Sequence, residues 1–171
     1  MNKLLIVSNM QNDLVKEAFQ AELLIPNIVN KIHQWDDEIV FLMDIHSDEN
    51  YGYLIEEELR PKHCIKGTWG AMMVDDIFGC YDPLYHSIIE RDGRIGSYGL
   101  IMNYLFPRKF EEIEIVGMET NTSIITDALM IRSAFPRTKI FIDPNYCAGT
   151  SYDLHLKALD IMNSCFITIR R

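Results

Sequence analysis

Asp44-Ile45-His46 is the first segment whose residue types and spacing suit chemistry. It ends an apolar run that predicts a buried strand, and side chains two positions apart on a strand project to the same face. Glu56 and His63 follow in the next loop, so two carboxylates and two imidazoles can converge on one ion. Such nitrogen and oxygen ligands suit Zn, Fe, Mn or Ni. The alternative is that Asp44 caps a loop and the histidines are solvated.

A second candidate is Gly117-Met118-Glu119-Thr120-Asn121-Thr122-Ser123, where a predicted strand ends and a predicted helix begins. Ser123 falls in the first helical turn, where unpaired backbone N–H groups and the helix dipole stabilise an anion. Enzymes place a nucleophile and its oxyanion hole at such a turn. The simpler interpretation is that one of these polar side chains is an N-cap.

Two further polar segments follow predicted strands: Ser8 to Asp13 after the first, and Glu90-Arg91 after the third. The first segment is equally well explained as a polar turn and the second as a solvated charge pair.

Leu14 and Trp69 are candidate substrate contacts, and the Trp69 ring either stacks on a ligand or packs within its loop. Cys147 follows the fifth predicted strand and is either a displaced nucleophile or a small buried thiol.

Short runs rich in Ile and Val alternate with longer amphipathic segments, the pattern of βαβ units around a parallel sheet. We therefore expect an α/β fold: a single domain over residues 1–171, built as a Rossmann-like three-layer α/β/α sandwich with a mainly parallel six-stranded sheet. Strands are predicted at Lys3 to Ser8, Glu38 to Met43, His86 to Ile89, Ile113 to Gly117, Lys139 to Ile142 and Phe166 to Ile169. Helices are predicted at Ile25 to Trp35, Gly99 to Phe106, Thr122 to Phe135 and Ser151 to Ser164.

The stretch from Ser47 to Tyr85 lacks steady periodicity, so we expect an extended loop region with short helices. Long irregular segments in compact domains often bind ligands. In sheets of this kind the ligand lies beyond the carboxyl ends of the strands. The polar residues just after each strand are therefore the candidate ligand-binding residues.

Composition disfavours several partners. The chain has 16 Lys and Arg against 25 Asp and Glu, a net charge of −9, so neither nucleic acid nor an anionic membrane surface is expected as a partner. No segment approaches the roughly 20 apolar residues that span a bilayer. The four cysteines are scattered without a Cys-x-x-Cys pair, which predicts reduced thiols in the cytoplasm. Small molecules or proteins are the expected partners.

Taken together, these segments resemble the isochorismatase-like cysteine hydrolases, and most closely the nicotinamidases. The resemblance spans nearly the whole chain and rests on Leu4 to Val7 with Gln11 to Asp13, Asp44 to His46, His63 to Gly70, Ile115 to Asn121, and Ile142 to Leu159. It implies the isochorismatase-like fold and a homo-oligomer.

The family's reaction uses an Asp that deprotonates a Cys, together with a Lys. The resemblance places Asn9 at the Asp position and Ser123 at the Cys position, while the Lys position falls on Arg91 or, with a slip of one residue, on Glu90. An amide is no base, and a serine hydroxyl is far less acidic than a thiol. Standard cysteine amidase activity is therefore not expected.

Unlike the triad, the residues that match the family's metal ligands are all present. Asp44, His46 and His63 match family ligands, and Glu56 matches a fourth ligand. In nicotinamidases the ion contacts the pyridine nitrogen, so we expect a divalent Zn, Fe or Mn ion and a pocket for a nitrogen heterocycle or amide.

The resemblance also implies a cis peptide between Met118 and Glu119, which directs the backbone N–H groups of Glu119 and Ser123 into the site as an oxyanion hole. Our leading hypothesis is a metal-binding, nicotinamidase-like protein without the triad, acting as a small-molecule binding or regulatory homologue. Two enzymatic alternatives stay open. Either Ser123 is a nucleophile activated by the metal centre or another carboxylate, or the metal activates water directly.

Overall fold

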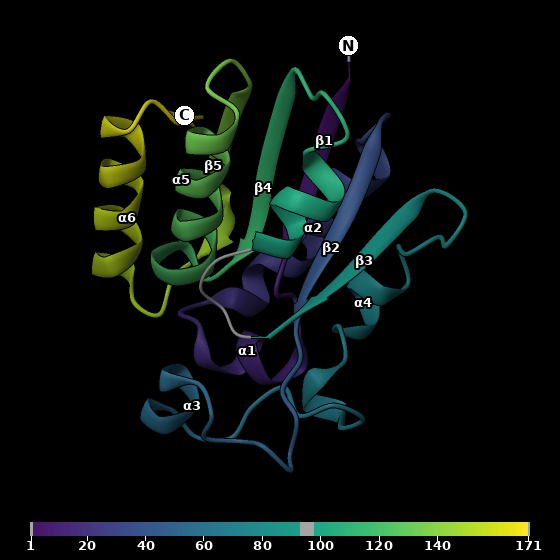
Figure 1. Cartoon of the computed structure of the whole chain (residues 1–171), viewed down its shortest axis with the longest axis vertical. Coiled ribbons are helices and arrows are strands. Elements are labelled where there is room, and N and C mark those ends of the chain that lie inside the picture. The colour runs from purple at the N-terminus through teal and green to yellow at the C-terminus, as the bar shows by residue number, and fades with distance from the viewer. Residues whose placement is uncertain (1, 93–97, 171) are drawn as a thin grey trace.

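The computed structural model describes residues 2–92 and 98–170, and six strands form one sheet in it (Figure 1). They are β1 (Lys3–Ser8), β2 (Glu38–Asp44), β3 (His86–Arg91), β4 (Glu112–Met118), β5 (Lys139–Ala148) and β6 (Thr168–Ile169), in the order β3-β2-β1-β4-β5-β6. Every neighbouring pair is parallel. The expected α/β class and all six strands are confirmed, although β5 continues to Ala148 and β6 begins only at Thr168.

Helices connect these strands. They are α1 (Asn12–Glu17), η1 (Ala21–Leu24), α2 (Ile25–Gln34), α3 (Ile55–Leu59), η2 (Trp69–Ala71), α4 (Asp75–Phe78), η3 (Leu100–Leu105), η4 (Thr120–Ile124), α5 (Ile125–Ala134) and α6 (Tyr152–Ser164). The single helix predicted from Thr122 to Phe135 is two elements, the π-helical turn η4 followed by α5. Among the described residues, no helix is long and apolar enough to cross a membrane.

Helix α1 was not predicted, because its sequence reads as a polar turn. Leu14 and Val15 are buried in the core, and this packing stabilises a helix that local sequence preferences do not indicate. The segment between β2 and β3 does contain the expected short helices, α3, η2 and α4.

The sheet is covered on both faces. Leu4 and Ile6 of β1 belong to a core cluster that includes side chains of η3, α5 and α6, whereas Leu5 and Val7 belong to a second cluster with side chains of α1, α2 and α4. Alternation along the strand sends these pairs to opposite faces, so the central strands are apolar throughout. This is the three-layer arrangement that the sequence indicates.

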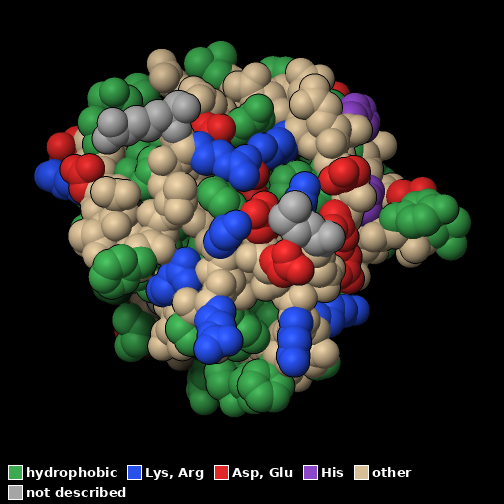
Figure 2. All heavy atoms as spheres, turned by 90° about the horizontal axis from the view of Figure 1, so that it is seen from above, with side chains coloured by type: hydrophobic (Ala, Val, Ile, Leu, Met, Phe, Trp, Pro, Cys, Tyr) green, Lys and Arg blue, Asp and Glu red, His purple; other side chains and the backbone are tan. Residues whose placement is uncertain are grey.

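The two ends of the sheet differ in chemistry. Figure 2 looks onto the end at which β1 begins, where Lys and Arg side chains lie among Asp and Glu. Ion pairs such as Lys139–Glu112 (3.4 Å) and Arg108–Glu38 (3.6 Å) involve residues that begin these strands or precede them. Most of the buried polar residues instead lie at the opposite, carboxyl end.

The strand order places a topological switch between β1 and β4, which is where ligands bind in open α/β sheets. Asn9 follows β1, Asp44 ends β2, Arg91 ends β3, and Glu119 and Ser123 follow β4. Four segments distant in sequence therefore meet at one end of the sheet.

Close approach of β1 and β4 at this end depends on Gly117. It pairs with Ser8 and has a φ of +107°, and a Cβ atom there would overlap the Ser8 carbonyl oxygen. Position 117 therefore requires both a positive φ and the absence of a Cβ atom, and only glycine meets both requirements.

We expect Gly117→Ala to lower the free energy of unfolding by about 3 kcal/mol or more, because strain and a backbone clash add. Gly67→Ala is the matched control: Gly67 also has a positive φ, +81°, but a Cβ atom at this position would meet nothing within 4 Å. It should lose only about 1–2 kcal/mol. Urea denaturation measures both, and equal losses would contradict the clash.

Candidate functional site

His46 and His63 lie side by side because two loops pair through their backbones. The N–H of His46 donates to the Cys64 carbonyl (3.0 Å), and the N–H of Lys66 donates to the His46 carbonyl (2.9 Å). The ring centroids of His46 and His63 are 4.6 Å apart, and both residues are buried.

Helix α3 brings a carboxylate to the two imidazoles. Glu56 Oε1 lies 3.4 Å from His63 Nε2, and one ligand atom from each of His46, Glu56 and His63 lies within 4.8 Å of the others. The three residues thus form a two-histidine, one-carboxylate cluster.

Neighbouring groups fix the tautomer of His46. Its Nδ1 lies 2.7 Å from Glu57 Oε1, and Glu57 also accepts from the backbone N–H groups of Gly52 and Leu54. Burial alone raises the pKa of Glu57, but the hydrogen bonds from Leu54, His46 and Gly52 outweigh it and lower that pKa. An ionised carboxylate only accepts, so Nδ1 carries the proton and Nε2 keeps its lone pair.

His63 is fixed in the same tautomer. Its Nδ1 lies 2.9 Å from the Pro61 carbonyl oxygen, which only accepts, and the Tyr51 hydroxyl is 3.0 Å from the same nitrogen. In the neutral ring, Nε2 of His63 therefore also keeps a lone pair. Burial lowers the pKa of His63, but the Glu56 carboxylate and the Pro61 carbonyl raise it further than burial lowers it.

These contacts fit a divalent metal ion. Within the described part of the chain, Nε2 of His46 and Nε2 of His63 are buried and make no hydrogen bond, and the nearest charged group to His63 Nε2 that is described is the Glu56 carboxylate at 3.4 Å. Buried polar atoms without hydrogen bonds are costly unless a ligand binds them. Metal-binding histidines usually donate their other ring nitrogen to a carboxylate or carbonyl, as both do here. His46, Glu56 and His63 are thus suited to hold Zn, Fe or Mn.

Asp44, the fourth ligand expected from the sequence, is directed elsewhere. Its Oδ1 accepts from Arg91 Nε at 2.7 Å and its Oδ2 from Asn9 Nδ2 at 2.9 Å. It does not belong to the cluster of three, so the structure brings together three of the four expected ligands.

The three residues that the resemblance places at the triad positions do come together. Asn9 Nδ2 lies 3.0 Å from Ser123 Oγ, and Arg91 Nη2 donates to Asn9 Oδ1 at 3.0 Å. Asn9 and Ser123 are both 0% exposed. Glu90 is exposed and contacts Lys66 at 3.3 Å, so Arg91, not Glu90, faces this network.

The network determines the orientation of the Asn9 amide. Arg91 only donates, so it must face Oδ1, and the Asp44 carboxylate must face Nδ2. The Asn9 amide nitrogen consequently donates to Ser123 Oγ. A nucleophile and its base have the opposite polarity, since the hydroxyl must donate to the base.

Sequence reasoning missed Asp127. This α5 residue is 0% exposed and receives two hydrogen bonds from Arg91 Nη1, at 3.2 and 2.9 Å. Burial lowers the pKa of Arg91, but Asp127 and Asp44 raise it further, so the guanidinium is charged. The available signal was a carboxylate one helical turn after Ser123 in a mainly apolar helix.

The turn before Ser123 has the expected backbone. The peptide bond between Met118 and Glu119 is cis, as the resemblance implies. The Glu119 side chain is buried and accepts from Thr122 Oγ1 at 2.8 Å, with Arg60 Nη1 at 3.7 Å. The oxyanion-hole role of its backbone N–H stays a prediction.

The two expected substrate contacts have different surroundings. Leu14 is fully buried within the core cluster of α1, α2 and α4. Trp69 is 56% exposed, and Lys16 Nζ lies 4.2 Å from the centroid of its ring, a cation–π contact. The Lys16 ammonium thus lies over the Trp69 ring, and more than half of the Trp69 side chain surface stays exposed.

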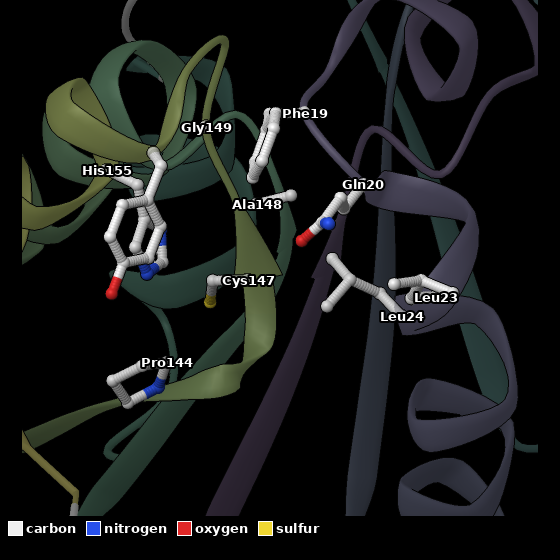
Figure 3. Close-up of a pocket in the computed structure, with 10 residues that line it drawn as sticks. Phe19, Gln20, Leu23, Leu24, Pro144, Cys147, Ala148, Gly149 and His155 are labelled. Carbon is white, nitrogen blue, oxygen red and sulfur yellow. The ribbon is translucent and has the colours of Figure 1, made fainter.

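Cys147 is a structural thiol in this arrangement. It is 4% exposed and donates weakly to the Ile115 carbonyl at 3.7 Å. It also lines a cavity of about 180 Å³ between η1 and β5, which His155 lines as well (Figure 3). Burial, with Asp143 and Glu114, raises the pKa of its thiol, which opposes thiolate formation.

No protein-family model and no curated protein matches the sequence, whereas solved structures match it along its whole length. The nicotinamidase/pyrazinamidase of Bacillus subtilis has a TM-score of 0.88 at 22% identity, with 100% of both chains covered. A pyrazinamidase of Pyrococcus horikoshii in complex with zinc has a TM-score of 0.84 at 22% identity, covering 100% of this chain and 99% of that one. PnC1 of L. infantum in complex with nicotinate has a TM-score of 0.84 at 15% identity, covering 99% and 92%. The fold is therefore the isochorismatase-like fold of these proteins.

We expect one divalent ion per chain, and Glu56→Gln should weaken its binding by about 100-fold, because the site loses its carboxylate. Glu58→Gln is the matched control, since Glu58 is an exposed residue of the same helix. Calorimetric titration of Zn into protein treated with chelator measures both. Equal affinities in the two variants would remove Glu56 from the ligand set.

Arg91→Met should lower the free energy of unfolding by about 3–5 kcal/mol, because two buried carboxylates lose their shared guanidinium. Lys157→Met removes an exposed pair with Asp153 (2.7 Å) and should change stability by less than about 0.5 kcal/mol. Urea denaturation compares them, and a small loss for Arg91→Met would show that the network contributes little.

Proposed function

We propose that this chain is a nicotinamidase-like member of the isochorismatase-like hydrolases that binds a divalent metal and a small molecule, and that it lacks cysteine amidase activity. One observation carries the proposal: Ser123 Oγ accepts a hydrogen bond from the Asn9 amide nitrogen instead of donating one to a base. The residue at the nucleophile position thus has no proton acceptor in Asn9, its neighbour at the base position.

The surrounding charges support the same conclusion. Arg91 is held by Asp44 and Asp127, so its charge is already compensated by two carboxylates. A guanidinium does not release a proton at physiological pH, and Asn9 cannot take one up. In this proposal Asn9, Arg91 and Ser123 form a structural network at the former position of a triad.

The metal would be held by His46, Glu56 and His63, with Glu57 and the Pro61 carbonyl fixing the imidazoles. Such an ion supplies Lewis-acid chemistry and a coordination point for a ligand atom. We infer a nitrogen heterocycle or an amide as the ligand class, because similar structures were solved with zinc and with nicotinate. Trp69 offers an exposed aromatic face for such a ring.

A metal-dependent amide hydrolase is the second candidate, and one observation favours it. Three protein ligands converge where the sequence indicated four, because Asp44 contacts Arg91 and Asn9. Three-ligand sites with open positions are typical of catalytic metals. In that case activity would depend on His46, Glu56 and His63 and not on Ser123.

Ammonia release from nicotinamide, pyrazinamide and simple amides, measured with protein loaded with Zn, Fe or Mn, separates these candidates. We expect no release from any of them, and nicotinamide binding in calorimetry only when metal is present. The tests need Ser123→Ala, a chelated sample and Ser164→Ala, an exposed serine near the end of α6, as a control.

Turnover that Ser123→Ala abolishes and Ser164→Ala preserves would overturn the proposal and make Ser123 a nucleophile. Turnover lost only on chelation would establish the metal-dependent hydrolase. Absence of both turnover and metal-dependent binding would reject the ligand class as well.

A further inference from the structure

The cavity between η1 and β5 takes no part in the proposed function. Its volume is about 180 Å³, and neither the metal-ligand cluster nor the residues at the triad positions line it. Figure 3 shows Gln20 and Leu24 on one side of the cavity and Pro144 and His155 on the other, with Cys147 between them. The two sides come from segments distant in sequence, so a molecule in the cavity would contact both.

Contacts within the chain hold the two sides together. The Phe19 N–H donates to the Gly149 carbonyl at 2.9 Å. The rings of Phe19 and Tyr152 approach each other with a centroid distance of 6.4 Å and an interplanar angle of 53°, and both residues line the cavity. The cavity is therefore formed without a ligand and has aromatic walls, two features that are typical of small-molecule sites.

His155 supplies a polar atom that lacks a partner. The residue is 9% exposed, lines the cavity, and has its Nδ1 at 2.9 Å from Thr120 Oγ1. Among the described residues this is the one hydrogen bond of the ring, so Nε2 makes none. Burial lowers the pKa of His155, which keeps the imidazole uncharged at neutral pH. A largely buried ring nitrogen without a hydrogen bond favours a ligand that can supply one.

Gln20 adds an amide group from the opposite side. Its φ of +54° and ψ of +25° lie in the left-handed region, which non-glycine residues seldom adopt. Figure 3 shows the Gln20 side chain directed from η1 towards β5, and within the described ranges its amide makes no hydrogen bond. Backbone strain of this kind is concentrated at functional sites. The strained residue thus directs a second polar group without a hydrogen bond into the cavity.

We propose that this cavity is a second binding site, for an uncharged molecule with one aromatic ring and one hydroxyl group, the chemistry of phenol. Volume limits the ligand to a single ring, because an apolar cavity of about 150 Å³ holds one benzene molecule and this cavity measures about 180 Å³. None of the described residues that line it carries a charge while His155 is neutral. An ion would therefore lose its hydration without gaining a charged partner.

The polar atoms of the cavity determine the functional group of the ligand. Nε2 of a neutral imidazole either donates or accepts, according to its tautomer, and a hydroxyl group can do both. The Gln20 amide also offers both a donor and an acceptor. A hydroxyl group therefore finds a partner on either side of the cavity, while the rings of Phe19 and Tyr152 provide aromatic surface for the rest of the molecule.

Phenol is the probe for the experiment, and toluene, which lacks the hydroxyl group, is the matched probe. In ¹H–¹⁵N NMR titrations of zinc-loaded protein, phenol should bind with a Kd of about 1 mM and shift the amides of Phe19 and Gly149 most. Toluene should bind about tenfold more weakly, because it cannot form the hydrogen bond. Benzoate and benzylammonium, which carry a charge, should not bind.

Two histidine variants locate the hydrogen bond. His155→Phe removes Nε2 and should lower the affinity for phenol to that for toluene. His33→Phe is the matched control, because it replaces an exposed histidine of α2 that does not line the cavity. It should keep the preference for phenol of about tenfold.

Gln20→Gly tests the other side of the cavity and is compatible with the fold, because glycine adopts a positive φ freely. This variant should bind phenol about threefold more weakly and toluene unchanged. It keeps the proposal testable if His155→Phe does not fold.

Four results would overturn the proposal: no phenol binding at about 20 mM, equal affinities of the wild-type chain for phenol and toluene, shifts confined to the metal-ligand cluster, or a phenol preference that neither His155→Phe nor Gln20→Gly reduces. Phenol binding should also persist after chelation, and its loss would place phenol at the metal instead. Nicotinamide binding is expected only with metal present, so this proposal and the proposed function can fail separately.

Discussion

Arg91 carries a positive charge into the interior at the carboxyl end of the sheet, where Asp44, Asp127 and Asn9 surround it. A buried guanidinium is stable only when its charge and its N–H groups are satisfied. The contacts come from the ends of β2 and β3, the segment after β1, and α5. This one cation therefore links groups from four segments that the parallel sheet brings to the same end.

The same cation determines what the neighbouring polar groups can do. Arg91 donates to the side-chain oxygen of Asn9, so the amide nitrogen of Asn9 faces Ser123. Arg91 also donates to one carboxylate oxygen of Asp44, and the Asn9 amide nitrogen donates to the other. A carboxylate in place of Asn9 would be a third negative charge beside Asp44 and Asp127, so the amide is the residue type that suits this network electrically.

The metal-ligand cluster depends on a separate set of contacts. Glu57 and Pro61 hold the Nδ1 atoms of His46 and His63, and the pairing of the His46 and Ile65 segments brings the two rings together. Neither imidazole contacts Arg91 in these interactions. Asn9, Arg91 and Ser123 can thus be substituted while the ligand set for an ion is retained. This is the combination proposed for this chain.

The sequence by itself determined the α/β class, the six strands and the positions of the polar segments that follow the strands, because alternating apolar runs and the polar residues after them are local patterns. It also predicted that His46, Glu56 and His63 could converge. Only the tertiary structure decided that Asp44 contacts Arg91 and Asn9, that Asp127 shares the guanidinium, and that α1 is a helix. These features depend on contacts between residues far apart in the chain, and residue spacing does not encode which of several nearby partners a buried charge takes.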